Sequence, residues 1–260
     1  MHGADMSPSR TNVSATAVMT RLGEQADTVA AMRRLFALIA AAGLVAVLAG
    51  CSGEAEAPQV PPTEQLAAAK TAFDAAKTVS LTLTSRDVPP RENGVTAAKG
   101  VGVIDATEPK FQGTITGTVE GIAATIDAIA IGDTAYLKLF TPQYEETDLT
   151  TLNAPNPAQF FNPATGISSL LPKTTDAKAA GQTRSGQDVL DRIDGTLDGA
   201  LVEDLLHLGD GTGTFTVSYG LTESNELRTA TLKGPFFPGV EATYLLTMTD
   251  YGAPATITRP

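Results

Sequence analysis

The chain has 260 residues, of which 42% are hydrophobic and only 5% aromatic, with one cysteine, two histidines and no tryptophan. This apolar content excludes a largely disordered chain, and a single cysteine excludes a disulfide within the chain. A formal net charge of −11 leaves no basic surface for a phosphate backbone, so we expect no nucleic-acid partner.

Residues 32–52 have the pattern of a secretion signal that ends at the only cysteine. Two arginines precede an apolar run over residues 35–49, and Gly50 stands directly before Cys51. The run is short for a membrane-spanning helix and has the basic start of a signal peptide. Small residues before a cysteine form a bacterial lipobox, which predicts acylation of Cys51. Two or more acyl chains on this residue are enough for stable membrane anchoring.

The residues in front of this signal fit it poorly. Asp5, Glu24 and Asp27 are unusual ahead of a signal peptide, so we expect translation to start at Met32. The sequence predicts three parts: a leader and signal peptide over residues 1–50, an acylated cysteine with a polar, proline-rich tether over residues 51–62, and a domain over residues 63–260. The tether favours extended backbone at about 3.1 Å per residue.

The domain is expected to begin with a helix and to continue as a sheet. Leu66, Ala69 and Phe73 recur at helical spacing and predict a helix over residues 63–77. From Val79 the period changes to two, which indicates a strand up to the prolines at 89 and 90. Four further strands are predicted over residues 94–107, 111–119, 122–131 and 135–140. Hairpin connections would make them an antiparallel sheet with one wet face.

The second half of the domain returns to strands after a mixed stretch. Prolines interrupt residues 141–198, where a short helix is expected over residues 166–171, and a leucine stripe predicts a second helix over residues 198–208. Alternating patterns then predict strands over residues 214–219, 227–233, 240–249 and 253–258. No internal repeat is visible, so one α+β domain is the simplest interpretation.

Few residues offer catalytic chemistry. His207, the one histidine of the mature domain, lies off the apolar stripe of its helix and is expected at the surface. The glycine-rich segment 209–213 precedes a strand and lacks the lysine of a phosphate loop, which indicates a flexible turn.

Four aspartates lie close together in the sequence, as in a calcium site, but their register is wrong for one. With Gly195 at loop position six, position one would be Leu190. We therefore interpret Asp188, Asp191, Asp194 and Asp198 as turn and cap residues. The sequence predicts no enzyme, no cofactor and no metal.

Several features together resemble a known family. These are the lipobox, the single N-terminal helix, the threonine-rich sheet and three segments: Phe161-Asn-Pro-Ala-Thr-Gly-Ile167, Asp176-Ala-Lys-Ala-Ala-Gly181 and Tyr251-Gly-Ala-Pro-Ala-Thr-Ile257. In this order along the chain they resemble the mycobacterial LppX/LprA/LprF/LprG lipoproteins over essentially all of residues 51–260.

The resemblance implies a fold, a ligand and a location. The fold is a half-open antiparallel β-barrel-like sheet with helices on its concave side, enclosing a hydrophobic cavity. The ligand is an acylated lipid or glycolipid, which such proteins carry across the periplasm toward the outer membrane, in some cases beside a membrane efflux transporter. The protein would be a monomer, lipid-anchored through Cys51 on the periplasmic face of the cell membrane.

The residues themselves leave two interpretations open. Inward stripes of the predicted strands contain many small side chains, such as Gly113, Gly117 and Ala128, which leave room for a ligand on a curved sheet. Alternatively, the two helices pack onto these residues and fill the space. The candidate cavity-lining residues are Leu81, Leu83, Val103, Phe111, Gly113, Ile115, Gly117, Val119, Ile126, Leu137, Phe215, Val217, Tyr244 and Leu246.

The two interpretations correspond to two functions. With a cavity, the protein is a lipid carrier whose ligand is held by the hydrophobic effect. With a filled core, it is a nonenzymatic adaptor or sensor of the cell envelope that acts through its surface.

Overall fold

The structure is a computed structural model that describes residues 60–119, 121–139 and 141–260. The predicted signal peptide, the acylated Cys51 and nearly all of the tether lie outside the described residues.

The described residues form one antiparallel sheet of eleven strands, in the order β6-β5-β4-β3-β2-β1-β11-β10-β9-β8-β7. The first meander contains β1 (Thr78–Arg86), β2 (Gly94–Val103), β3 (Lys110–Val119), β4 (Ile122–Ile131), β5 (Thr134–Lys138) and β6 (Glu145–Thr147). The second contains β7 (Thr175–Ser185), β8 (Asp188–Asp198), β9 (Thr214–Leu221), β10 (Leu227–Phe237) and β11 (Val240–Thr249). The two meanders join where β1 pairs with β11, so the first and last strands lie side by side at the centre.

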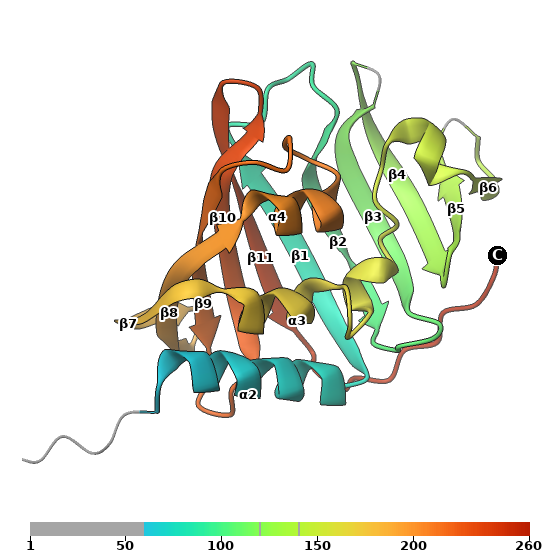
Figure 1. Cartoon of the computed structure of the whole chain (residues 1–260). Helices are drawn as coiled ribbons and strands as arrows, with labels where there is room; N and C mark the ends of the chain where they lie inside the picture. Colours follow the sequence, from blue (N-terminus) through green and yellow to red (C-terminus); the bar gives the residue numbers. More distant parts are fainter. Residues whose placement is uncertain (1–59, 120, 140) are drawn as a thin grey trace, which may run out of the picture. The chain divides into compact units, whose positions relative to one another are not determined.

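The helical segments lie on one face of this sheet (Figure 1). The connection from β6 to β7 contains η1 (Leu149–Leu152), η2 (Gln159–Phe161), α3 (Ile167–Leu170) and η3 (Leu171–Lys173). Because β6 and β7 are the two edge strands, this crossing segment has to span the full width of the sheet. α4 (Gly199–Leu206) and α2 (Pro62–Ala75) cover the same face. The predicted half-open sheet with helices on its concave side is therefore confirmed.

The helix α2 packs through the stripe that its sequence predicts. Leu66, Ala69 and Phe73 are almost completely buried, and a proline occupies its first turn, where no backbone N–H donor is needed. Phe73 also meets the ring of Tyr251 edge-on at 6.1 Å between centroids. The helix is thus held against the domain by apolar contacts.

A polar cluster fastens the crossing segment to α2. Lys70 Nζ donates to Asp74 Oδ2 and to the carbonyl oxygen of Pro163, both at 2.6 Å. The buried Ser168 hydroxyl of α3 donates to the other carboxylate oxygen of Asp74, also at 2.6 Å. Hydrogen bonds to a charged group are stronger than neutral ones, so this cluster fixes how α3 lies over the sheet.

The β7–β8 hairpin is the largest departure from the predicted elements. Where β8 pairs with β9, its inward row alternates the apolar Ile193 and Leu197 with Asp191 and Gly195. β7 is mostly exposed and its pairing with β8 shifts register twice. A hydrophobic alternation is therefore too weak to be recognised in either strand.

The four aspartates of this region split between strand and cap. Asp198 is the N-cap of α4, where its carboxylate accepts from the backbone N–H of Ala200 at 2.9 Å. Asp188, Asp191 and Asp194 lie on β8, so their interpretation as turn residues was wrong.

The strand predicted over residues 253–258 is not present. This segment runs over the outer face of the sheet instead, with the hydroxyl of Thr78 donating to the carbonyl oxygen of Ala253 at 2.6 Å. Its Ile257 is buried against Ile129 and Ile131 of β4. The apolar residues that suggested a strand are explained by this packing.

Candidate functional site

An apolar cavity lies between the concave face of the sheet and the helices that cover it. Its volume is about 270 Å³. Among the described residues that line it there is no Asp, Glu, Lys or Arg. A site of this composition is suited to hydrocarbon, and His207 is the one ionisable side chain besides tyrosine in the described lining.

The floor of the cavity is built by the inward rows of both meanders. Ile115 of β3 stands opposite Ala98 of β2 and Ile126 of β4, and all three line the cavity. At the join of the meanders, Leu83 of β1 is paired with Leu246 of β11, and both line it as well. Of the predicted candidates, the following lie in the lining: Leu81, Leu83, Phe111, Ile115, Gly117, Val119, Ile126, Leu137, Val217, Tyr244 and Leu246.

Three candidates lie elsewhere. Val103 is on the outer face, packed against the cluster of Ile129, Ile131 and Ile257, because Gly102 and not Val103 belongs to the inward row of β2. Gly113 faces inward, but a Cβ there would lie 2.7 Å from the ring of Phe111, which already fills the space.

Phe215 also faces inward without reaching the cavity. It is 1% exposed and meets Phe236 edge-on at 4.8 Å between ring centroids. Its ring covers Gly234 of β10, where an added Cβ would collide with it. This part of the concave face is solidly packed.

The roof of the cavity comes from residues that sequence reasoning did not single out. The leucine stripe of α4 was the one signal that pointed to them, since a helix that packs on a sheet turns its apolar side inward. The lining residues of the crossing segment and α4 are Leu149, Leu152, Asn153, Ala154, Pro155, Pro157, Phe160, Phe161, Ile167, Leu170, Leu205, Leu206, His207 and Leu208.

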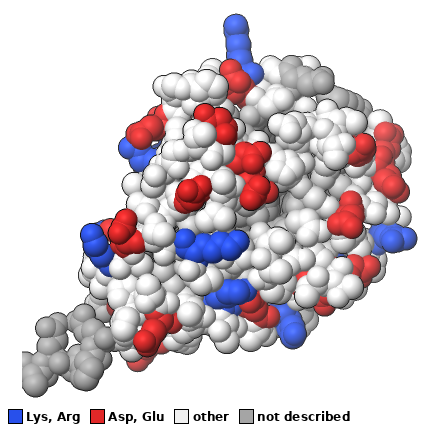
Figure 2. Space-filling view, in the orientation of Figure 1, with Lys and Arg blue, Asp and Glu red and all other residues white. Residues whose placement is uncertain are grey.

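Exposed lining residues mark the mouth of the cavity. Asn93 follows β1, Asn153 follows η1, and His207 ends α4 in the left-handed conformation with φ 52°. The expectation that His207 lies at the surface is confirmed. On the face shown in Figure 2, acidic and basic side chains are interspersed.

Two tyrosines bring hydroxyl groups to the cavity. The hydroxyl of Tyr219 on β9 forms a hydrogen bond with that of Thr174 at 3.0 Å, and burial raises the pKa of Tyr219 to about 12. Burial likewise raises the pKa of Tyr244 to about 12. Both side chains are therefore uncharged at neutral pH.

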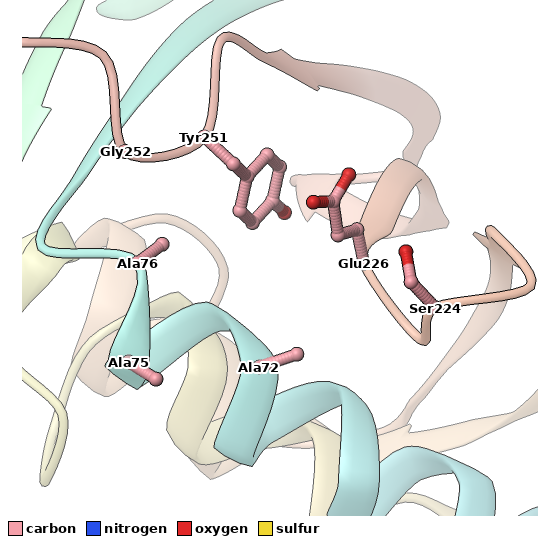
Figure 3. Close-up of a pocket in the computed structure, with 7 residues that line it drawn as sticks. All are labelled: Ala72, Ala75, Ala76, Ser224, Glu226, Tyr251 and Gly252. Atoms are coloured by element: carbon pink, nitrogen blue, oxygen red, sulfur yellow. The ribbon is translucent and has the colours of Figure 1, made fainter.

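A second hollow lies between the C-terminal half of α2 and the β9–β10 turn (Figure 3). It measures about 390 Å³ but is widely open to solvent, with Ala72, Ala75 and Ala76 on one side and Ser224 and Glu226 on the other. It is a surface depression and not an enclosed site.

The ring of Tyr251 projects between the two sides of this depression (Figure 3). Its hydroxyl donates to the carbonyl oxygen of Leu227 at 2.6 Å. Burial and, to a smaller extent, the nearby carboxylate of Glu226 raise the pKa of Tyr251. The polar group that this ring brings to the depression is thus already paired.

Among the described residues, no three histidine, cysteine, aspartate or glutamate side chains gather as they would around a metal ion. None of the helices in this part of the chain has the length and apolar character needed to cross a membrane.

Comparison with known proteins gives both a fold and a family. The fold is similar to that of LprF from Mycobacterium bovis, with a TM-score of 0.65 and 13% identity over 76% of this chain and 96% of that one. It is also similar to that of LppX from Mycobacterium tuberculosis, with a TM-score of 0.57 and 14% identity over 76% and 98% of the two chains. No curated protein sequence matches the chain. The profile of the LppX_LprAFG lipoprotein family matches residues 61–257, and the chain therefore belongs to this family.

Proposed function

We propose that the protein binds the acyl chains of a lipid or glycolipid in the apolar cavity and carries this ligand across the periplasm toward the outer membrane. The observation that supports it is a cavity of about 270 Å³ whose described lining contains no Asp, Glu, Lys or Arg. Membership of a lipoprotein family agrees with a location in the cell envelope.

The hydrophobic effect supplies the affinity. Each buried CH₂ group contributes about 0.8 kcal/mol, so the affinity rises with the length of acyl chain that the cavity buries, before the costs of binding.

Native mass spectrometry of the full-length chain carrying Cys51→Ala, produced in a lipid-containing host, tests the binding. The carrier proposal expects a mass excess that corresponds to a co-purified lipid. A lipid-free protein that also takes up none when lipid is added would favour the alternative, an envelope adaptor or sensor that acts through its surface.

The proposed location depends on Cys51. Replacing Cys51 by alanine should prevent acylation, so we expect the protein to be released from the membrane or to remain uncleaved. Fractionation of cells and detection of the protein in membrane and soluble fractions measures this. Unchanged membrane retention of a processed protein would contradict the lipobox. Lipid binding should survive the substitution, because the cavity is built entirely from residues after 80.

A further inference from the structure

One residue of the cavity lining carries a buried polar group without a partner. Tyr244 of β11 lines the cavity and is only 3% exposed, and its buried hydroxyl forms no hydrogen bond with any described residue. Buried polar groups in native proteins are nearly always paired, so an orphaned hydroxyl needs an explanation. In a ligand-binding cavity, the ligand itself is a natural source of the missing acceptor.

The other polar groups of this kind are either paired or remote. The hydroxyl of Tyr219 is paired with Thr174, and that of Tyr251 with Leu227. The hydroxyl of Ser169 also lacks a partner, but Ser169 does not line the cavity. The Nε of Arg228 has a carboxylate oxygen of Asp188 at 3.2 Å. Within the described chain, Tyr244 thus holds the orphaned polar atom of the cavity.

The position of this hydroxyl is fixed by its surroundings. The ring of Tyr244 meets Phe236 edge-on at 4.7 Å between centroids and 71° between planes. On the neighbouring strand it stands opposite Leu232, and Leu246 follows two residues later on the same face; both also line the cavity. A ring held between such neighbours cannot turn its hydroxyl to solvent. The donor is therefore held at one point beside the hydrocarbon side chains of the lining.

The surroundings of the Tyr244 hydroxyl favour an uncharged hydrogen-bond acceptor. No Asp, Glu, Lys or Arg of the described lining faces it, and an ionised carboxylate buried without a cation is strongly disfavoured. A plain hydrocarbon would leave the hydroxyl unpaired. The carbonyl oxygen of an ester combines both requirements, because it accepts a hydrogen bond, carries no charge and joins two apolar segments.

We propose that the Tyr244 hydroxyl donates a hydrogen bond to the ester carbonyl of a bound acyl lipid, so that the cavity selects neutral ester-linked chains over ether-linked or unsubstituted ones. This inference rests on the proposed lipid binding and adds to it a residue that determines specificity. Tyr244 sets the depth in the cavity at which the carbonyl lies.

Paired lipids separate this inference from simple hydrophobic binding. The full-length Cys51→Ala protein is stripped of lipid and titrated with a diacylglycerol and with the dialkyl ether of equal chain length. We expect the ester to bind about two- to ten-fold more tightly than the ether, which corresponds to one hydrogen bond. Tyr244→Phe should weaken ester binding more than ether binding and so remove most of the preference, because an ether oxygen is a weaker acceptor than an ester carbonyl. Tyr136→Phe, on the outer face beside Ile129, should keep the preference.

Infrared spectroscopy gives a readout that does not depend on affinity. The stretching band of a ¹³C-labelled ester carbonyl should shift to lower frequency in the original protein and return in Tyr244→Phe, because only the former offers a donor. Equal affinity for ester and ether together with an unshifted band would overturn the role of Tyr244 while leaving lipid binding intact. Binding of neither lipid would overturn the proposed function itself. A free fatty acid that binds better than the ester would also contradict the inference.

Discussion

Two regions of the same concave face differ in what lies above their glycines. At Gly234, in the packed region of Phe215, Phe236 and Ala242, an aromatic ring occupies the space that a side chain would have taken. At Gly117, in the hollow region of Ile115, Val119 and Leu83, the three atoms nearest to an added Cβ belong to the backbone of β2 and none to a ring, and the residue lines the cavity. A glycine in a sheet therefore makes room for a ligand only where no ring lies over it.

The distribution of phenylalanines explains where the cavity ends. Phe161 of the crossing segment covers Gly102, and Phe111 covers Gly100, with the two rings stacked at 6.1 Å and 9°. These rings form one wall of the cavity, since both also belong to its lining. Both regions thus have glycines on the inward face of the sheet. They differ in how much of the space above the sheet is filled by aromatic rings.

The largest expected effect on stability comes from removing an aromatic side chain from the packed region. Phe215→Ala removes a ring that is 1% exposed and leaves a void above Gly234, which should lower the free energy of unfolding by about 3–5 kcal/mol. Leu83→Ala, in the wall of the hollow region, should lower it by about 1–2 kcal/mol, because a half-buried side chain beside a cavity loses fewer contacts. Urea denaturation measures both. Equal losses would contradict the distinction between the two regions.

A smaller effect is expected from filling the hollow region. Ile115→Trp places its bulk in the cavity, so lipid binding should be lost while the melting temperature stays near that of the original protein. The matched control is Ile193→Trp, at a side chain with no exposed area, which should cost about 1–3 kcal/mol or more by overpacking. Calorimetry and lipid titration measure the pair. A large drop in melting temperature for Ile115→Trp, with no lipid bound by either form, would indicate a solid core.

The sequence predicted the inward residues of the strands better than the residues of the helical segments that cover the cavity. Strict alternation in β3 and β11 identified their inward rows, because a half-buried strand has a period of two. β2 was misread, since glycines occupy its inward row and Val103 its outer one. A glycine has no apolar side chain to mark the inward row of a strand. Val103, which faces outward, therefore suggested the wrong face.

The packing of aromatic rings is what sequence reasoning could not provide. That Phe111 fills the space at Gly113, and Phe215 the space at Gly234, depends on rotamers and on neighbours across the sheet. The same holds for the crossing segment, whose path follows from pairing β1 with β11 and from the Lys70, Asp74 and Ser168 cluster. These are long-range contacts, and no local periodicity reports them.

The smallest expected effect is a pH dependence that arises in the hollow region. Burial raises the pKa of Tyr219 to about 12 in the folded protein, against about 10 in an unfolded chain. Its contribution to stability is therefore complete below pH 10 and is lost as the pH rises from 10 through 12. We expect no change attributable to Tyr219 between pH 7 and pH 9, and a loss of about 1 kcal/mol at pH 10.5. Urea denaturation at these pH values measures it.

Tyr219→Phe is the control that assigns this effect to one hydroxyl. The variant keeps the ring but cannot ionise, so its stability should fall less steeply above pH 10 than that of the original protein, with Tyr244 and Tyr251 still contributing because their pKa values are raised as well. The contact between the rings of Phe215 and Phe236 in the packed region involves no ionisable group. It should therefore contribute nothing to the pH dependence of stability. If the original protein and the variant lose stability in parallel, the loss arises elsewhere, and Tyr219 is not held in the buried, hydrogen-bonded position beside Thr174 that the cavity requires.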